Sequence, residues 1–98
     1  MSVLMTLRVS GDPKAVEATE QAVLDTIISR AKEHGLIRHQ FYGTDKEVLV
    51  VDEWPDQDSF QRFFDASPEI KQMMDGAGVT APPQIDFWRP LDMNDSVT

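Results

Sequence analysis

Cysteine is absent from this 98-residue chain, and histidine occurs only twice. The first absence excludes disulfide frameworks, thiolate nucleophiles and zinc sites built on cysteine. The second leaves no histidine cluster that could hold a metal, so we expect no metal site. The chain also has no glycine-rich phosphate loop or dinucleotide fingerprint, which leaves a bound nucleotide without support.

Basic residues are scarce: nine Lys and Arg stand against seventeen Asp and Glu, a net charge of −8. Phosphate backbones and anionic membranes repel so acidic a surface, so we expect no nucleic-acid partner and no membrane partner. No apolar run is long enough to span a bilayer. The first six residues lack the basic start and apolar core of a signal peptide. We therefore expect a cytoplasmic protein.

Length and composition describe one small globular domain. Hydrophobic residues make up 41% of the chain and charged residues 27%, an ordinary globular balance. A domain of this length buries only about 60–65% of its unfolded surface, and pairing with a second copy is a common source of further stability. We place the domain at residues 1–91 and expect a flexible polar tail at residues 92–98.

Hydrophobic patterning predicts an α+β protein. Apolar, β-compatible segments predict four strands, at residues 3–10, 36–42, 47–54 and 84–89. Helical periodicity predicts one long helix from Asp12-Pro13 to Gly35, then two short helices begun by Pro55-Asp56 and Ser67-Pro68. The order β-α-β-β-α-α-β is the split β-α-β arrangement of a ferredoxin-like fold. It predicts a four-stranded antiparallel sheet with helices on one face.

The predicted sheet has apolar side chains on both faces, but the helices cover only one. A sheet with two apolar faces needs two covers. We therefore expect a homodimer in which a second copy stacks on the bare face. Arg38 and Glu53 lie on the hairpin face that we assign to this interface, close enough for an ion pair within or between subunits. The sequence leaves open the inverse assignment, which would exchange the pocket and the interface.

One histidine and one aspartate meet on the predicted hairpin. A turn at residues 43–46 pairs Tyr42 with Glu47 and His39 with Val50, which makes His39 and Asp52 diagonal neighbours, roughly 6–8 Å apart at Cβ. A carboxylate beside an imidazole fixes its tautomer and makes it a usable general base. Side-chain alternation places Ile37, Phe41 and Trp54 on the same face.

The candidate catalytic residues are therefore His39 as the base and Asp52 as its orienter. The candidate ligand contacts are the aromatic residues Trp54, Phe41 and Phe63, which could hold a small aromatic compound. The alternative is a structural polar pair in an apolar layer, with the phenylalanines of the short helix as core. The second histidine, His34, is expected to cap the long helix.

The segment from Val50 to Phe60, VVDEWPDQDSF, resembles the antibiotic biosynthesis monooxygenase-like family of dimeric α+β barrels. The family pattern is a strand ending in an acidic residue and Trp, an acidic helix start, a buried aromatic, a second helix and a last strand with an aromatic, here Phe87-Trp88. The resemblance implies the dimeric barrel fold and a cofactor-independent monooxygenase-like protein that acts on a small aromatic or polyketide-like compound. The alternative within the family is a non-catalytic dimeric ligand-binding or stress-related protein.

The resemblance does not extend to the haem-degrading branch of this family. Those members carry an Asn on the first strand, where this chain has Thr6 and Leu7. Their helical Trp matches Phe63, and their haem-ligating His falls near Gln72 or Met73. Because all three residues are missing, we expect no haem-degrading activity. The cofactor-free oxygenases use Trp, Asn, Tyr and Arg around an aromatic pocket. Only Trp54 matches a position of the family motif. The other residues of this chain that could take such a role are Arg8, Arg38, Gln40, Tyr42 and Arg89.

Overall fold

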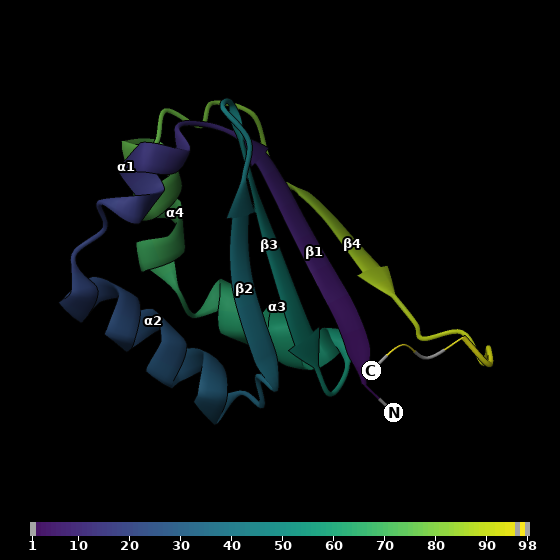
Figure 1. Cartoon of the computed structure of the whole chain (residues 1–98). Helices are drawn as coiled ribbons and strands as arrows, with labels where there is room; N and C mark the ends of the chain where they lie inside the picture. Colours follow the sequence, from purple (N-terminus) through teal and green to yellow (C-terminus); the bar gives the residue numbers. More distant parts are fainter. Residues whose placement is uncertain (1, 96, 98) are drawn as a thin grey trace.

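The computed structural model describes residues 2–95 and 97 (Figure 1). The described chain folds into four strands and four helices. In chain order they are β1 (Val3–Ser10), α1 (Pro13–Glu17), α2 (Gln21–Glu33), β2 (Arg38–Gly43), β3 (Glu47–Trp54), α3 (Gln57–Asp65), α4 (Pro68–Gly76) and β4 (Gln84–Trp88).

The strands form one antiparallel sheet in the order β2-β3-β1-β4. All four helices lie on one side of this sheet, and its other side carries no helix (Figure 1). The architecture confirms the predicted ferredoxin-like α+β fold with helices on one face. The sheet of one chain is open, with β2 and β4 as its edges.

The long helix expected between Asp12 and Gly35 is divided into α1 and α2. The backbone N–H of Ala18 closes α1 on the Lys14 carbonyl at 3.0 Å. Glu20 then takes an extended conformation, with φ −59° and ψ 135°, before α2 begins. The β-branched Thr19 between them has low helix propensity. Val16 and Val23 lie seven residues apart, which is two helical turns, so helical spacing spans Thr19 and Glu20 and periodicity alone does not reveal the break.

Local interactions fix two helix ends where the sequence predicts them, the end of α2 and the start of α3. Gly35 has a positive φ of 103° directly after α2, a conformation that favours glycine. A Cβ atom there would also lie 2.9 Å from the ring of Pro55. Asp56 caps α3 by accepting hydrogen bonds from the backbone N–H and the hydroxyl of Ser59, both at 2.8 Å. The Ser59 bonds lower the pKa of Asp56.

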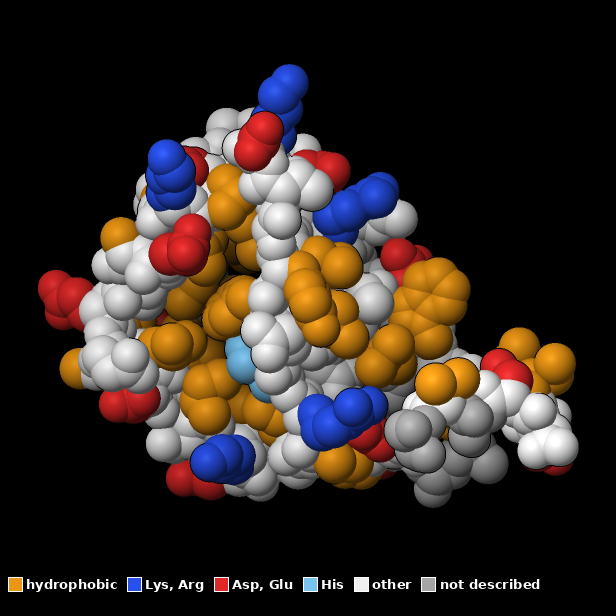
Figure 2. All heavy atoms as spheres, viewed as in Figure 1, with side chains coloured by type: hydrophobic (Ala, Val, Ile, Leu, Met, Phe, Trp, Pro, Cys, Tyr) orange, Lys and Arg blue, Asp and Glu red, His pale blue; other side chains and the backbone are white. Residues whose placement is uncertain are grey.

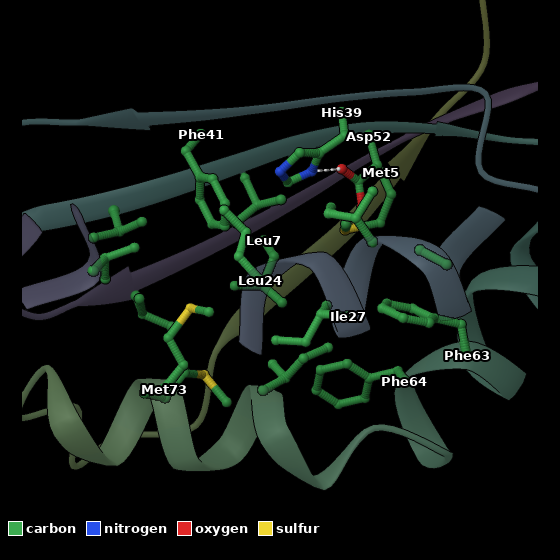
Figure 3. A pocket seen from close by; sticks show the side chains of 18 of the residues that line it. Met5, Leu7, Leu24, Ile27, His39, Phe41, Asp52, Phe63, Phe64 and Met73 are labelled. Carbon is green, nitrogen blue, oxygen red and sulfur yellow. Dashed lines mark hydrogen bonds and ion pairs between the residues drawn. The ribbon is translucent and has the colours of Figure 1, made fainter. Parts of the chain in front are cut away.

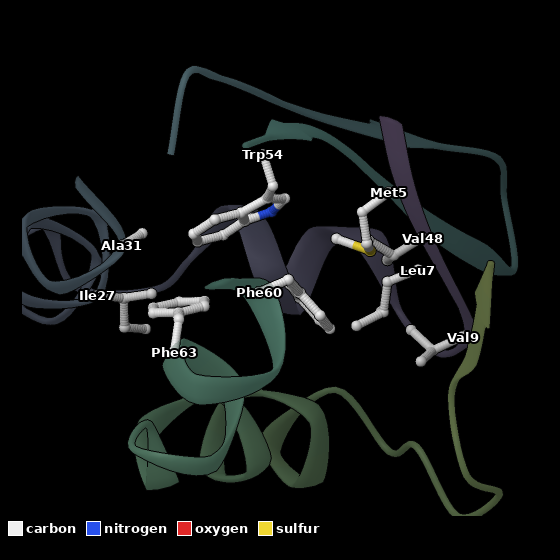
Figure 4. Packing of buried hydrophobic residues seen from close by; sticks show 9 residues of the cluster. All are labelled: Met5, Leu7, Val9, Ile27, Ala31, Val48, Trp54, Phe60 and Phe63. Carbon is white, nitrogen blue, oxygen red and sulfur yellow. The ribbon is translucent and has the colours of Figure 1, made fainter. Parts of the chain in front are cut away.

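The core lies between the sheet and the helices, and α3 supplies two of its buried aromatic side chains, Phe60 and Phe63 (Figure 4). Trp54 has no exposed surface, and its ring centroid lies 5.7 Å from Phe60 and 5.3 Å from Phe63. Met5 from β1 is also fully buried. Each large apolar side chain buried in this way contributes about 1.5–3 kcal/mol. This aromatic cluster is the rigid support beside the site described next.

Candidate functional site

The β2–β3 hairpin sets the position of the candidate site. His39 pairs directly with Asp52, and Phe41 pairs with Val50. The predicted register was wrong by two residues because the turn is centred one residue later than predicted, between Asp45 and Lys46. Thr44 N–H donates to the Glu47 carbonyl at 2.9 Å, and the Thr44 hydroxyl oxygen accepts from the backbone N–H groups of Lys46 and Glu47. A slip of two residues keeps every side chain on its predicted face.

The helix-facing side of the sheet therefore carries the predicted set of side chains, with one correction. His39 lies in a row with Asp52, Met5 and Phe87 across the four strands. Ile37, which was expected on this face, is 52% exposed because β2 begins only at Arg38. The alternation of side chains cannot be extended past the start of a strand.

Three polar side chains form a short hydrogen-bonded chain at this position. His39 Nδ1 lies 2.7 Å from Asp52 Oδ1, and Trp54 Nε1–H donates to Asp52 Oδ2 at 3.2 Å. The Asp52 side chain is 6% exposed and that of His39 is 22% exposed. Both carboxylate oxygens of a buried aspartate are thus hydrogen-bonded, as burial of a charge requires.

A cavity of about 80 Å³ lies between the sheet and the helices. Figure 2 shows a hollow between the helical layer and the sheet in which a histidine side chain lies among hydrophobic ones. Figure 3 shows His39 and Asp52 on the sheet side, facing apolar side chains from the helices. Apart from His39 and Asp52, every residue that lines the cavity is apolar. The arrangement places one imidazole in the wall of an otherwise apolar pocket.

The predicted ligand contacts divide into two groups. Phe41 and Phe63 line the cavity, and Phe41 meets the His39 ring edge-on at a centroid distance of 4.6 Å. Trp54 does not line the cavity, because Phe60 and Phe63 pack on it and leave it no exposed surface. Its contact with the site is the hydrogen bond to Asp52.

Sequence reasoning missed most of the apolar wall. Leu24 and Ile27 from α2, and Met73 and Met74 from α4, are among the lining residues that the sequence did not identify as ligand contacts. Their helical spacing indicates an inward face, but it does not show whether that face meets other side chains or a cavity. The Trp54–Asp52 hydrogen bond was predictable from the sequence, since side chains two residues apart on a strand point to the same face.

Most of the other polar residues considered for oxygenase chemistry lie away from the cavity. The strand register places Arg8, Arg38, Gln40 and Tyr42 on the sheet face opposite His39. Arg38 Nε–H donates to Glu53 Oε1 at 2.7 Å within the chain. Hydrogen bonds from Ser2 and Arg38 lower the pKa of Glu53.

An ion pair joins α2 to the start of α4 beside the cavity. Arg30 binds Glu69 through both of its terminal nitrogens, at 2.6 and 3.0 Å. These bonds lower the pKa of Glu69 to about 2 and raise that of Arg30. Because α2 and α4 both supply cavity residues, this bidentate contact fixes the position of the outer wall.

The described residues offer neither a metal-binding cluster nor a membrane-spanning helix. Residues 2–95 and 97 contain no group of three histidine, aspartate or glutamate side chains placed to hold a metal ion. Within the same residues, no helix combines the length and hydrophobicity needed to cross a bilayer. The second histidine, His34, caps α2, and its Nδ1 lies 2.9 Å from the Arg30 carbonyl.

Solved structures share this fold at low sequence identity. The cofactor-independent oxygenase SnoaB of Streptomyces nogalater is 17% identical, with a TM-score of 0.64, over 97% of this chain and 98% of that one. The ActVA-Orf6 monooxygenase of Streptomyces coelicolor, in complex with Nanaomycin D, is 14% identical, with a TM-score of 0.67, over 98% and 93%. A dimeric ferredoxin-like protein from an uncultured marine organism is 16% identical, with a TM-score of 0.63, over 98% and 93%.

These likenesses show that the chain has the fold of antibiotic biosynthesis monooxygenases. No protein-family profile matches the chain, and no curated protein matches it. The shared fold agrees with the resemblance read from residues 50–60.

Proposed function

We propose that the cavity beside His39 is the binding site of a small aromatic compound and that His39 is its general base. The observation that carries this proposal is the 2.7 Å contact between His39 Nδ1 and Asp52 Oδ1 in the wall of an apolar cavity. An imidazole oriented by a carboxylate can take a proton from a bound hydroxyl group through its other nitrogen. Phe41 and Phe63 supply aromatic surface for the ligand.

The reaction that fits this arrangement is a cofactor-independent monooxygenation. His39 takes the proton of a phenolic hydroxyl, and the resulting anion is electron-rich enough to reduce dioxygen. One oxygen atom enters the ring as the second carbonyl of a quinone, and the other leaves as water. The substrate supplies all four electrons, so this chemistry requires no cofactor. The oxygenases that share the fold support this choice of reaction class.

Oxygen uptake with a panel of small hydroxylated aromatics tests this proposal. We expect uptake with at least one compound, and we expect His39→Ala to abolish it. His34→Asn is the matched control, because His34 caps α2 and does not line the cavity. Unchanged uptake by His39→Ala would contradict the catalytic role. Saturable binding without uptake would support the non-catalytic ligand-binding alternative.

We also propose that the chain works as a homodimer. The uncovered sheet face carries the half-buried residues Leu4, Leu49 and Val51, and Tyr42 and Trp88 are 56% and 53% exposed on it. Large exposed apolar groups on one face favour burial against a partner. The dimeric ferredoxin-like protein with the same fold supports this assembly. Stacking two sheets through this face would complete the barrel that one open sheet cannot form.

A further inference from the structure

Trp54 and Asp52 together determine which ring nitrogen of His39 donates a hydrogen bond and which accepts one. The indole Nε1–H can only donate, and it occupies Asp52 Oδ2 at 3.2 Å. The other oxygen of an ionised carboxylate can only accept, so the His39 nitrogen 2.7 Å from it carries the hydrogen. A neutral imidazole with its hydrogen on Nδ1 leaves Nε2 as an acceptor. The site therefore presents an acceptor to a ligand.

The acceptor nitrogen faces the cavity. Within residues 2–95 and 97, no side-chain hydrogen bond uses His39 Nε2; the ring is bonded only through Nδ1. Figure 3 shows the second ring nitrogen on the side away from Asp52, toward Phe41. The His39 side chain keeps 22% of its surface exposed. A ligand group in the cavity can thus bind this nitrogen without breaking an existing side-chain hydrogen bond.

The rest of the cavity wall offers nothing to an anionic ligand. No Lys or Arg side chain is among the residues that line it, and its one acidic side chain, Asp52, is bonded on both oxygens. A carboxylate or phosphate brought into the cavity would lose its hydration without gaining a cationic partner. The wall therefore selects against anions.

The size of the cavity limits the ligand as well. Apolar cavities of about 150 Å³ hold a single benzene ring, whereas this one measures about 80 Å³ and opens to solvent at one side. Three methionines, Met5, Met73 and Met74, line it and can shift to widen it. A single ring that enters from the open side fits this space better than a fused polycyclic compound.

We propose that the cavity selects compounds of single-ring size without negative charge by accepting one hydrogen bond, from the ligand hydroxyl, at His39 Nε2. The proposal rests on the proposed function, since it takes the cavity to be the ligand site. It adds that the site distinguishes hydrogen-bond donors from acceptors. A phenol therefore binds, whereas its hydroxyl-free and carboxylate analogues bind more weakly or not at all.

Three probes of similar shape test this selection. Binding of p-cresol, p-xylene and 4-methylbenzoate is followed by ¹H–¹⁵N and methyl NMR titration at about pH 8, where an ordinary imidazole is neutral. A net hydrogen bond of about 1 kcal/mol corresponds to about fivefold to tenfold in affinity. We expect p-cresol to bind about fivefold to tenfold more tightly than p-xylene, and 4-methylbenzoate to show no saturable binding in the cavity.

The variant Asp52→Asn should change His39 Nε2 from a hydrogen-bond acceptor into a hydrogen-bond donor. Because Trp54 N–H still needs an acceptor, it holds the amide oxygen of Asn, and the amide NH₂ then faces His39 Nδ1. That forces the imidazole hydrogen onto Nε2, which becomes a donor. We expect 4-methylanisole, an acceptor without a hydroxyl, to bind several-fold more tightly to Asp52→Asn than to the wild type. His34→Asn is the control and should keep the wild-type order.

The outcomes separate this proposal from the one on which it rests. If none of the four compounds perturbs cavity residues, the binding site itself is refuted. If p-xylene binds in the cavity as tightly as p-cresol, or 4-methylbenzoate binds best, the cavity is a ligand site and only the hydrogen-bonding selection is overturned. If Asp52→Asn fails to fold, the comparison of p-cresol with p-xylene in wild type and His39→Ala decides, because the preference should vanish in His39→Ala.

Discussion

His39 lies directly across the β2–β3 ladder from Asp52, and its Nδ1 atom is 2.7 Å from Asp52 Oδ1. The pair lies at the boundary between the packed core and an apolar cavity. Its two members should therefore depend on each other energetically. Removal of one leaves a polar group of the other without its partner in a place that water reaches poorly.

A double-mutant cycle measures this dependence. We expect Asp52→Leu and His39→Leu each to lower the free energy of unfolding by about 1–3 kcal/mol, because each leaves a buried polar group unpaired. The double variant should be more stable than the sum of the single effects predicts, by about 1 kcal/mol or more. Urea unfolding followed by circular dichroism gives the values. Additive losses would mean that the two side chains are not coupled.

The two tryptophans form a natural pair for comparison. Trp54→Phe removes the donor to Asp52 Oδ2 and leaves a space in the core, so we expect a loss of about 1–3 kcal/mol. Trp88 is 53% exposed, and its Nε1–H donates to the Thr6 hydroxyl at 2.9 Å. Trp88→Phe keeps an aromatic ring in the proposed dimer interface and removes only the hydrogen bond to Thr6, so it should cost under about 1 kcal/mol. Thermal and urea unfolding compare the two variants, and equal losses would contradict the assigned role of Trp54.

The Arg30–Glu69 contact predicts acid sensitivity. Hydrogen bonds from Arg30 hold the pKa of Glu69 at about 2 in the fold, below its ordinary value of 4.5. A depressed carboxyl pKa stabilises the fold above the ordinary value, and that stabilisation is lost as the pH falls from about 4.5 toward 2. Glu69→Gln should therefore reduce the loss of stability over this interval. Glu17→Gln, at an exposed position on α1, should not.

The fold and much of the pairing follow from local sequence features. The strand at residues 47–54, the cap at Asp56 and the positive φ at Gly35 are each determined by neighbouring residues, so patterning predicts them. The hairpin register was not predicted because the Thr44 hydroxyl centres the turn on Asp45 and Lys46, one residue later than the sequence pattern suggests. The break at Thr19 was not predicted, because the apolar residues on either side of it keep helical spacing.

The candidate site was predictable only in part, for a geometric reason. Alternation along β2 and β3 places His39, Phe41 and Asp52 on one face, and the structure places them on the helix side of the sheet. No periodicity gives the separation between sheet and helices, on which the cavity depends. Trp54 illustrates the difference: its face is predictable, but the packing of Phe60 and Phe63 decides that it supports Asp52 instead of meeting a ligand.

A charge on the uncovered sheet face should disrupt the proposed dimer. Size-exclusion chromatography with light scattering should give twice the chain mass of 11.1 kDa for the wild type. Leu49→Lys places an ammonium group in the proposed interface and should shift the protein toward monomer. Val23→Lys is the control, since Val23 lies on α2, away from this face. A wild-type monomer at micromolar concentration would contradict the inference that a second copy covers the bare sheet face.

Intermolecular nuclear Overhauser effects between p-cresol and the methyl groups of the protein test the central claim most directly. The account predicts contacts from the p-cresol ring to methyl groups of Leu7, Ile27 and Met73, which approach the cavity from three different elements. It also predicts that these contacts weaken in His39→Ala. Contacts confined to residues of the uncovered sheet face, such as Leu49 and Val51, would contradict it.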